Sequence, residues 1–405
     1  MQIVRWLIIS ILGLLVGIFL IIYLTVSPIQ MSFYLLITLL AIFLLVALLS
    51  RFRGRYLILA GILSFLSFGI GYYLMTSIVL DREDTREIPQ ITRGKNEPGN
   101  DRTAVVYFTH GEPETYDPVG WLNQFREFDE QGIPFVPLFA RPMFIYQLRN
   151  AYLKVGQSHH RQMHIQMVKA LDKAFIEDGY SGIDVYLSFL DDKPRPDAAV
   201  IKALNDGASK IIAAEVFVTI SNHTAEGEEL INSVNTQDYG VSLKFTGPLW
   251  DSETLHRMFL EKTNSAIGDT DKLKVGVILV GHGQPDEWDD EFPTETEQEL
   301  LFREQILDLL AADGYDPDNL GLAWMSFKDP KPAEKVEELL SNGVEKIVFF
   351  SAAISADSIH SQYDIPELIH EAEIPEGFQV INLGAWNDHP LAIQAIKDLV
   401  ISQME

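Results

Sequence analysis

The chain has 405 residues, contains no cysteine and carries a formal net charge of −26 at pH 7. Without cysteine it can build no disulfide, catalytic thiolate, cysteine-bound zinc site or iron–sulfur site. The first 80 residues hold four of the 31 basic side chains and none of the 57 acidic ones, so the remainder carries −30. Such a surface repels nucleic acid and attracts cations.

Long uncharged stretches open the chain. Residues 6–50 and residues 56–80 contain no charged side chain. About 20 consecutive apolar residues span a bilayer as a helix. The pattern therefore predicts a membrane anchor over residues 1–80, with a turn at 27–30 and three transmembrane helices at about 6–26, 32–50 and 56–80.

Arginines predict how this anchor is oriented. Arg5 precedes the first span, and Arg51, Arg53 and Arg55 fill the loop between the second and third. With three spans both positions lie on one side, which the positive-inside rule makes cytoplasmic. We therefore expect an integral membrane protein whose soluble domain is extracytoplasmic. The same placement follows if the first span is a cleaved signal peptide.

Residues 81–102 are polar, mixed in charge and contain Pro and Gly, which is typical of a linker. Beyond them, short apolar strands alternate with amphipathic helices, a pattern that predicts an α/β fold with parallel sheets. The expected strands are 104–109, 184–190, 210–218, 274–280, 320–326, 346–354 and 379–384. The expected helices are 158–178, 196–206, 295–312, 332–341 and 390–403.

The soluble region also repeats itself. Residues 193–212 match residues 329–348 without a gap, and each copy reads as a turn, a helix ended by Gly and a buried strand. The repeat predicts two similar doubly wound βαβ halves, 103–250 and 251–405. The first half carries an additional apolar and aromatic insert at about 115–155.

Each half places one His-Gly pair after its first strand and a second histidine after a later strand. These are His110 and His223 in the first half, and His282 and His360 in the second. Ligands of open α/β sheets bind beyond the carboxyl ends of the strands, and paired imidazoles suit a borderline divalent metal. Asp364, one helical turn after His360, is positioned to bind metal or accept a proton. A lone histidine at a strand end is more often a surface or structural residue, so the recurrence carries this interpretation.

The other histidines show no such pattern. His159, His160 and His164 are expected on the polar face of a helix, and His256, His370 and His389 have no matching partner. The HGQP segment runs into an acidic stretch, 286–299, which is either a solvated helix start or a weak outer path for a metal. Asp289, Asp290 and Glu291 are the best candidates for such a path.

These motifs resemble the ferrochelatase superfamily, the class II chelatases that insert a divalent metal into a tetrapyrrole. "VGHGQP" resembles the Ser-Ala-His-Gly-Leu-Pro segment, which aligns His282 with the catalytic histidine. "DEFPTETEQ" resembles the Gly-Asp-Pro-Tyr…Gln segment, and residues 149–171 resemble the Tyr…Gly-Gly-Ser-Pro-Leu stretch and its helix. The insert at 133–154 resembles the lip that covers the porphyrin and faces the membrane. "HSQYDIP" differs from ferrochelatases, which have glutamate at the His360 position, and matches the His-x-x-x-Asp-Ile-Pro motif of small cobalt and sirohydrochlorin chelatases.

The resemblance implies a membrane-anchored enzyme that inserts Fe²⁺ or Co²⁺ into a porphyrin-type ring, with the metal as substrate and no tightly bound cofactor. It implies that His282 takes a pyrrole proton or holds the metal, that His360 binds the metal and that Asp364 supports it. His110 and His223 are the second candidate metal pair. The candidates for contacts with the ring and its propionates are Arg141, Arg149, Tyr152 and Lys154. The expected partners are a tetrapyrrole, a divalent metal and the lipid bilayer. A non-catalytic haem, porphyrin or metal-binding protein outside the cell is the alternative, and a pseudo-enzyme used as an interaction domain is a third possibility.

Overall fold

The computed structural model describes residues 2–82, 88–130 and 136–404 of the chain. It divides into two compact units, residues 1–86 with 115–157, and residues 87–114 with 158–405. The first unit contains α1 (Gln2–Thr25), α2 (Pro28–Leu49), α3 (Arg55–Leu80), α4 (Val119–Glu130) and α5 (Arg141–Val155). Part of the predicted linker, residues 83–87, lies outside the described residues.

Helices α1, α2 and α3 are long and apolar enough to cross a membrane. They confirm the three predicted apolar helices, although α2 begins at Pro28, inside the turn predicted at 27–30. Small residues let α1 and α3 approach closely. A Cβ on Gly13, Gly17 or Gly71 would overlap with the main chain of the facing helix. Close approach through small residues is typical of packing between membrane helices, where van der Waals contact replaces the hydrophobic effect.

The insert of the first half groups with these three helices rather than with the sheet that precedes it. The Tyr116 hydroxyl donates to the main-chain oxygen of Thr25 at the end of α1, at 2.9 Å. Arg149 on α5 is fully buried and donates to the main-chain oxygens of Tyr23 and Val26, the latter at 3.0 Å. The positive guanidinium thus satisfies carbonyls that a helix end leaves without donors.

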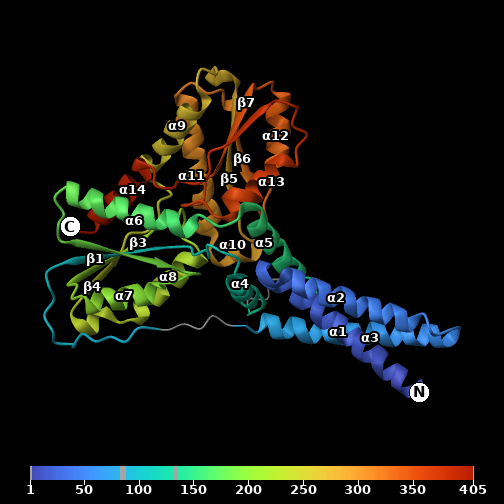
Figure 1. The fold of residues 1–405 in the computed structure, drawn as a ribbon. Coiled ribbons are helices and arrows are strands. Elements are labelled where there is room, and N and C mark those ends of the chain that lie inside the picture. The colour runs from blue at the N-terminus through green and yellow to red at the C-terminus, as the bar shows by residue number, and fades with distance from the viewer. Residues whose placement is uncertain (1, 83–87, 131–135, 405) are drawn as a thin grey trace. The chain divides into compact units, whose positions relative to one another are not determined.

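The second unit contains two parallel four-stranded sheets, ordered β2-β1-β3-β4 and β6-β5-β7-β8 (Figure 1). Their identical order confirms the two predicted βαβ halves. The strands are β1 (Thr103–Thr109), β2 (Ile183–Phe189), β3 (Lys210–Glu215), β4 (Ser242–Phe245), β5 (Val275–Gly281), β6 (Leu320–Trp324), β7 (Lys346–Ser351) and β8 (Gln379–Asn382). The helices are α6 (His160–Glu177), α7 (Pro196–Asn205), α8 (Asn222–Ser233), α9 (Glu253–Ile267), α10 (Asp286–Glu291), α11 (Pro293–Ala312), α12 (Pro332–Ser341), α13 (Ile365–His370) and α14 (Pro390–Ser402). β4 was not expected, because it has only four residues and alternates exposed and half-buried positions at a sheet edge.

One hydrophobic core joins the two halves. Inward-facing residues of both central strands, such as Val105 of β1 and Val277 of β5, share it with α6, α9, α11 and α14. The outer faces form separate clusters, under α7 and α8 in the first half and under α12 and α13 in the second. Because both sheets contribute to one dry interior, the two halves fold as one unit.

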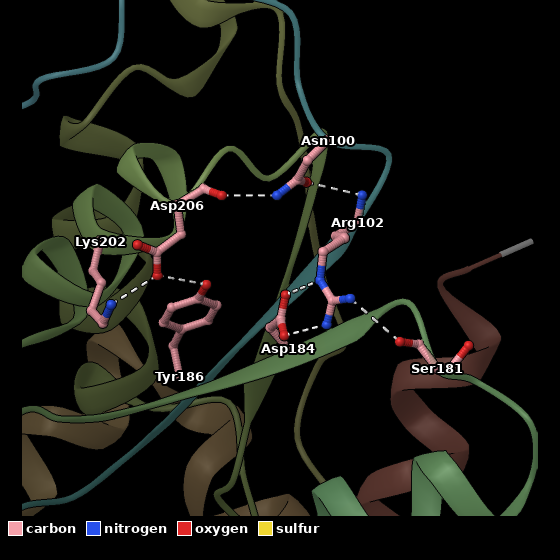
Figure 2. A network of polar contacts seen from close by, with 7 residues as sticks. All are labelled: Asn100, Arg102, Ser181, Asp184, Tyr186, Lys202 and Asp206. Carbon is pink, nitrogen blue, oxygen red and sulfur yellow. Dashed lines mark hydrogen bonds and ion pairs between the residues drawn. The ribbon is translucent and has the colours of Figure 1, made fainter.

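The end of the predicted linker is fixed to the amino-terminal end of the first sheet. Figure 2 shows Arg102 donating to both carboxylate oxygens of Asp184 on β2. Asn100 donates to the main-chain oxygen of Asp206 at 2.8 Å, and Tyr186 donates to the Asp206 carboxylate at 3.0 Å (Figure 2). These contacts secure the start of β1 at one end of the sheet and leave the loops at the carboxyl ends to form a site.

Candidate functional site

The strand order locates the candidate site. In each half, the first strand (β1 or β5) lies between the second and the third strand of that half. The strand order therefore reverses at β1 and at β5, and open α/β sheets bind ligands at such a switch point. His110 follows β1 directly, and His282 follows β5 directly. His223 lies at the start of α8 after β3, and His360 begins a π-helical turn, His360–Asp364, after β7. The four predicted histidines therefore all lie on segments that follow the carboxyl ends of the strands.

The loop around His282 is shaped by two buried charged side chains of α11, Glu299 and Arg303. The main-chain nitrogen of His282 donates to the Glu299 carboxylate at 2.6 Å, and Arg303, one turn further along α11, is fully buried beside it. A Cβ on Gly281 would overlap with both side chains, so a glycine is required there. Gly283 adopts a φ of +77°, and its Cβ would overlap with the main-chain oxygen of Ser326. Steric contacts thus require a glycine on each side of His282.

The His282 side chain is held in one tautomer. Its Nδ1 lies 2.7 Å from the Gly283 carbonyl oxygen, which can only accept, so Nδ1 carries the proton and Nε2 keeps its lone pair. Burial, together with the nearby charge of His360, lowers the pKa of His282 to about 4. His282 is therefore a neutral imidazole at physiological pH, the form that binds metals.

His360 is held in the same way by a carboxylate. Its Nδ1 lies 2.6 Å from Oδ2 of Asp364, the contact expected for residues one turn apart. Burial acts to lower the pKa of His360, but the hydrogen bond and charge of Asp364 outweigh it, so the pKa is raised. The His282 and His360 rings lie 5.8 Å apart between centroids. A histidine whose Nδ1–H is bound by an oxygen presents Nε2 in the orientation and basicity typical of metal ligands.

The first half has an equivalent arrangement. His110 Nδ1 lies 3.2 Å from Oδ2 of Asp191, in the loop after β2, and the His110 and His223 rings lie 4.2 Å apart between centroids. The His223 ring also lies 6.3 Å from that of Trp288 on α10, which belongs to the second half. Burial, with the charge of His110, lowers the pKa of His223 to about 3. The sequence analysis missed Asp191, although its place after a strand could have indicated it.

The two pairs influence each other through their charges. Burial and the charge of His360 are the larger causes of the low pKa of His282, and the charge of His110 adds to them. In the same way, the charge of His282 contributes to the low pKa of His223, where burial is the largest cause. These four side chains form one group of imidazoles. Among the described residues, no set of three or more His, Asp or Glu side chains is arranged to hold a metal by itself. Any metal here would complete its coordination with water or substrate.

The prediction that His160 and His164 lie on a polar face is wrong. Their exposed fractions are 3% and 0%, whereas His159 is exposed. His164 Nδ1 lies 2.8 Å from the Tyr107 hydroxyl, and the Nε2 atoms of His160 and His164 are 3.3 Å apart. Burial lowers the pKa of His160 to about 3. The signal was present in the sequence: His160 and His164 precede the buried Met167 and Leu171 at helical spacing, on one stripe.

Glu112 is a further residue that the sequence analysis missed. Its carboxylate accepts from the main-chain nitrogen of Ile359, at 3.0 Å, and from the Ser158 hydroxyl. It thereby connects the loop after β1 to the residue that precedes His360. Burial raises the pKa of Glu112, although the hydrogen bond from Ser158 and the charge of His360 oppose the shift.

Three of the four residues predicted to contact the ring have partners inside the first unit. Arg141 is paired with Asp129 and lies 5.0 Å from the Phe125 ring, and Arg149 is bound to the carbonyls at the end of α1. Tyr152 is buried with its ring 6.2 Å from that of Tyr116, and Lys154 is exposed in the last turn of α5. Their role toward a substrate stays a prediction.

The acidic residues after HGQP differ in exposure. Asp289 is half-buried and accepts from Lys328, and from Gln284 and Thr296 at 2.7 Å each. Burial opposes the ionisation of Asp289, but these hydrogen bonds and the Lys328 charge lower its pKa overall. Asp290 and Glu291 are exposed. Of the three candidates for a metal path, Asp289 is therefore engaged locally, whereas Asp290 and Glu291 lie on the surface.

Comparisons with known proteins bear on this site. The ferrochelatase family model matches residues 102–404. No curated protein matches the chain. SirB from Bacillus subtilis with Fe3+ is similar at 13% identity, over 74% of this chain and 95% of that one, with a TM-score of 0.47. The sirohydrochlorin chelatase SirB from Bacillus subtilis subspecies spizizenii, in complex with cobalt, is similar at 10% identity over 74% and 94%, with a TM-score of 0.42. DR2241 from Deinococcus radiodurans is similar at 12% identity over 74% and 55%, with a TM-score of 0.46. These structures are too distant to support conclusions about the site, so only the family match bears on function.

Proposed function

We propose a function from the fact that this chain belongs to the ferrochelatase family. The family supports metal-chelatase chemistry, and we assign the chain the insertion of Fe²⁺ or Co²⁺ into a porphyrin-type tetrapyrrole. The observation that carries the assignment is the pair formed by His282 and His360. Each Nδ1 is held by an oxygen, and the two rings lie 5.8 Å apart at the switch point of the second sheet.

Insertion exchanges two pyrrole protons for one divalent ion, so the site must handle both metal and protons. His282 is neutral, because its pKa is about 4, and its Nε2 lone pair is free for a metal or a proton. The raised pKa of His360 favours its imidazolium form, which must release the Nε2 proton to bind the ion. Asp364 stabilises the imidazolium before that exchange and orients the neutral ring afterwards. One histidine is thus ready to bind, and the other couples binding to proton release.

The charge of the chain favours this pair of substrates. The −30 carried by residues 81–405 attracts divalent cations, and the exposed Asp290 and Glu291 lie in the segment that follows His282. The same charge disfavours a heavily carboxylated ring such as sirohydrochlorin. A porphyrin with two propionates needs few basic partners, and Lys154 is the exposed candidate among the predicted ones.

Activity assays with the full-length protein in detergent test the proposal. A dicarboxylate porphyrin and Fe²⁺ or Co²⁺ are mixed anaerobically, and insertion is followed by the shift of the porphyrin absorption bands. We expect the wild type to catalyse insertion. The insertion rate should fall at least tenfold in His282→Ala, because changes around a metal typically lower metal affinity or activity by about 10- to 100-fold. His370→Ala, an exposed histidine at the end of α13, is the matched control and should match the wild type.

A wild-type rate equal to the uncatalysed rate would refute the enzyme assignment. Tight binding of haem or porphyrin without insertion would then favour a non-catalytic binding protein. The glutamate that ferrochelatases carry at the His360 position motivates this alternative, and His360→Glu tests it directly. Regained or faster iron insertion in His360→Glu would show that this position selects the metal.

We further propose that α1, α2 and α3 anchor the protein in a membrane with the second unit outside the cytoplasm. Their length and apolar composition, and the arginines at residues 51–55, support this placement. Protease treatment of intact cells provides the test. Cleavage of the second unit without lysis is expected, and protection until lysis would place it in the cytoplasm.

A further inference from the structure

The two halves differ in the loop that follows their second strand. In the first half, the main-chain nitrogen of Phe189 donates to the main-chain oxygen of Pro194 at 2.8 Å, with four residues between them. In the second half, the main-chain nitrogen of Trp324 donates to the main-chain oxygen of Pro330 at 2.9 Å, with five residues between them. The loop after β6 is therefore one residue longer than the otherwise equivalent loop after β2.

The longer loop contains a strained turn centred on Phe327. The main-chain nitrogen of Lys328 donates to the main-chain oxygen of Ser326 at 2.6 Å, which closes a three-residue γ-turn, and Phe327 at its centre has a φ of +58°. A γ-turn with positive φ is rare, and glycine or asparagine adopts this backbone at lower cost than phenylalanine. Strain of this kind persists only where the surrounding structure fixes it, and it is concentrated at ligand sites.

This turn is held against the His282 loop through both neighbours of Phe327. The main-chain nitrogen of Ser326 donates to the main-chain oxygen of His282 at 3.0 Å. A Cβ on Gly283 would lie 2.4 Å from the Ser326 oxygen and 3.4 Å from the Lys328 side chain. Lys328 also forms ion pairs with two aspartates of α10. Phe327 therefore lies at the tip of a fixed turn beside the proposed metal-binding histidine.

The ring of Phe327 is exposed at this position. Its exposed fraction is 40%, and within the described part of the second unit it is the one exposed aromatic side chain. The aromatic residues Trp288 and Trp324 nearby in the chain are both buried. Exposed apolar surface is costly in water, and an aromatic ring recovers that cost by stacking on another flat ring. Ligand sites are typically lined by such rings.

From these contacts we propose that Phe327 is a specificity-determining residue that stacks on the conjugated macrocycle of the substrate beside His282. The inference rests on the proposed function, because it takes a porphyrin as the ligand of this site. It adds a side chain that binds the ring rather than the metal. The fixed turn presents the aromatic ring before the ligand arrives, which lowers the ordering cost of binding.

Titration of the full-length protein in detergent with a metal-free dicarboxylate porphyrin tests the proposal, and porphyrin fluorescence reports binding. We expect Phe327→Ala to weaken porphyrin binding roughly 3- to 10-fold, and Phe327→Tyr to keep the wild-type affinity because it keeps the ring. Leu273→Ala is the control. It removes a more exposed apolar side chain, 57% exposed, just before β5 at the opposite end of the sheet, and should bind porphyrin like the wild type.

Two further measurements separate stacking from a structural role. In insertion assays Phe327→Ala should raise the KM for porphyrin and leave kcat unchanged, the pattern of lost ground-state binding. Phe327→Gly relieves the turn, so it should melt at no lower temperature than Phe327→Ala while binding porphyrin equally weakly. Titration with Co²⁺ alone should give the wild-type affinity in both variants, because the histidines are unchanged.

The outcomes separate this proposal from the proposed function. Wild-type porphyrin affinity in Phe327→Ala would overturn the role of Phe327 and leave the chelatase assignment intact. Weakened Co²⁺ binding in Phe327→Gly would make Phe327 a structural residue of the His282 loop and would also overturn it. Porphyrin binding that depends on Phe327 but leads to no catalysed insertion would refute the enzyme and support the stacking residue. A wild type that binds no porphyrin would overturn the inference, whereas the insertion assay decides the enzyme separately.

Discussion

Replacing Glu299 by alanine should destabilise the second unit and release the His282 loop together. Glu299 and Arg303 are both buried, with exposed fractions of 2% and 0%. Arg303 donates to the main-chain oxygens of Ala323, at 2.8 Å, and Leu279, at 3.2 Å, and its guanidinium lies 3.9 Å from the Trp324 ring centroid. These contacts hold Arg303 in place, so the substitution removes a carboxylate whose charge favours this buried cation, and it leaves the His282 main-chain nitrogen without its acceptor.

Leaving a buried hydrogen-bond donor without its acceptor costs about 1–3 kcal/mol of unfolding free energy. For a unit of this size each kcal/mol lowers the melting temperature by roughly 2–4 °C, so Glu299→Ala should melt about 2–12 °C below the wild type. Glu299→Gln keeps an acceptor for the His282 main-chain nitrogen, so it should retain more Co²⁺ binding at His282 and His360 than Glu299→Ala.

Fluorescence-monitored thermal unfolding of the full-length protein in detergent measures the effect. Asp308→Ala, an exposed residue on the same helix, should melt within about 1 °C of the wild type, since surface substitutions typically change stability by less than 0.5 kcal/mol. A melting temperature of Glu299→Ala equal to that of Asp308→Ala would refute the reasoning.

Three further predictions concern other buried groups. Burial raises the pKa of Glu295 from 4.5 to about 8, so its contribution to stability is complete below pH 4.5 and is lost as the pH rises through 8. The free energy of unfolding, measured with urea, should decline between pH 6 and 8. The decline should be shallower in Glu295→Gln by up to about 1.4 kcal/mol per pH unit, and identical slopes in the two proteins would contradict this. Arg149→Ala leaves two carbonyls at the end of α1 without their donor and should cost about 2–4 kcal/mol in detergent thermostability. The exposed Lys154→Ala is its control, and equal melting of the two variants would count against the role of Arg149. Gly283→Ala adds steric overlap to a positive φ and should abolish Co²⁺ binding at the second-half pair. Gly240→Ala is the control: its φ is +68° and no described atom lies within 4 Å of the added Cβ, so it should cost only about 1–2 kcal/mol of unfolding free energy. Retained Co²⁺ binding in Gly283→Ala would show that the His282 loop tolerates a side chain there.

Much of the fold could be predicted because its elements depend on local patterns. The repeat at 193–212 and 329–348 became two helix–strand units, α7 with β3 and α12 with β7, and the glycines that end both helices have positive φ values. β4 escaped prediction because a short edge strand buries too few side chains to show a clear pattern. α9 was also missed, although Leu255, Met258 and Phe259 recur at helical spacing.

The site was only partly predictable, for a different reason. The contact between His360 and Asp364 follows from a spacing of four residues, so it could be read from the chain. The partners of Glu112, Asp191 and Glu299 could not be read in this way, because each lies tens to hundreds of residues away in the chain. His160 and His164 were misassigned because polarity was weighed above helical spacing, whereas the tertiary fold pairs them with each other and with Tyr107.

By itself, the sequence determined the three apolar helices, the alternation of strands and helices, the duplication, and the placement of a histidine after each central strand. These features depend on hydrophobic period, length and short-range spacing, which act along the chain. Only the tertiary structure decided which side chains stand behind the histidines, that the insert packs with the apolar helices, and that Arg303 lies buried beneath His282. Such contacts depend on which distant segments share one desolvated space, and there an unpaired polar group is costly enough to select its partner.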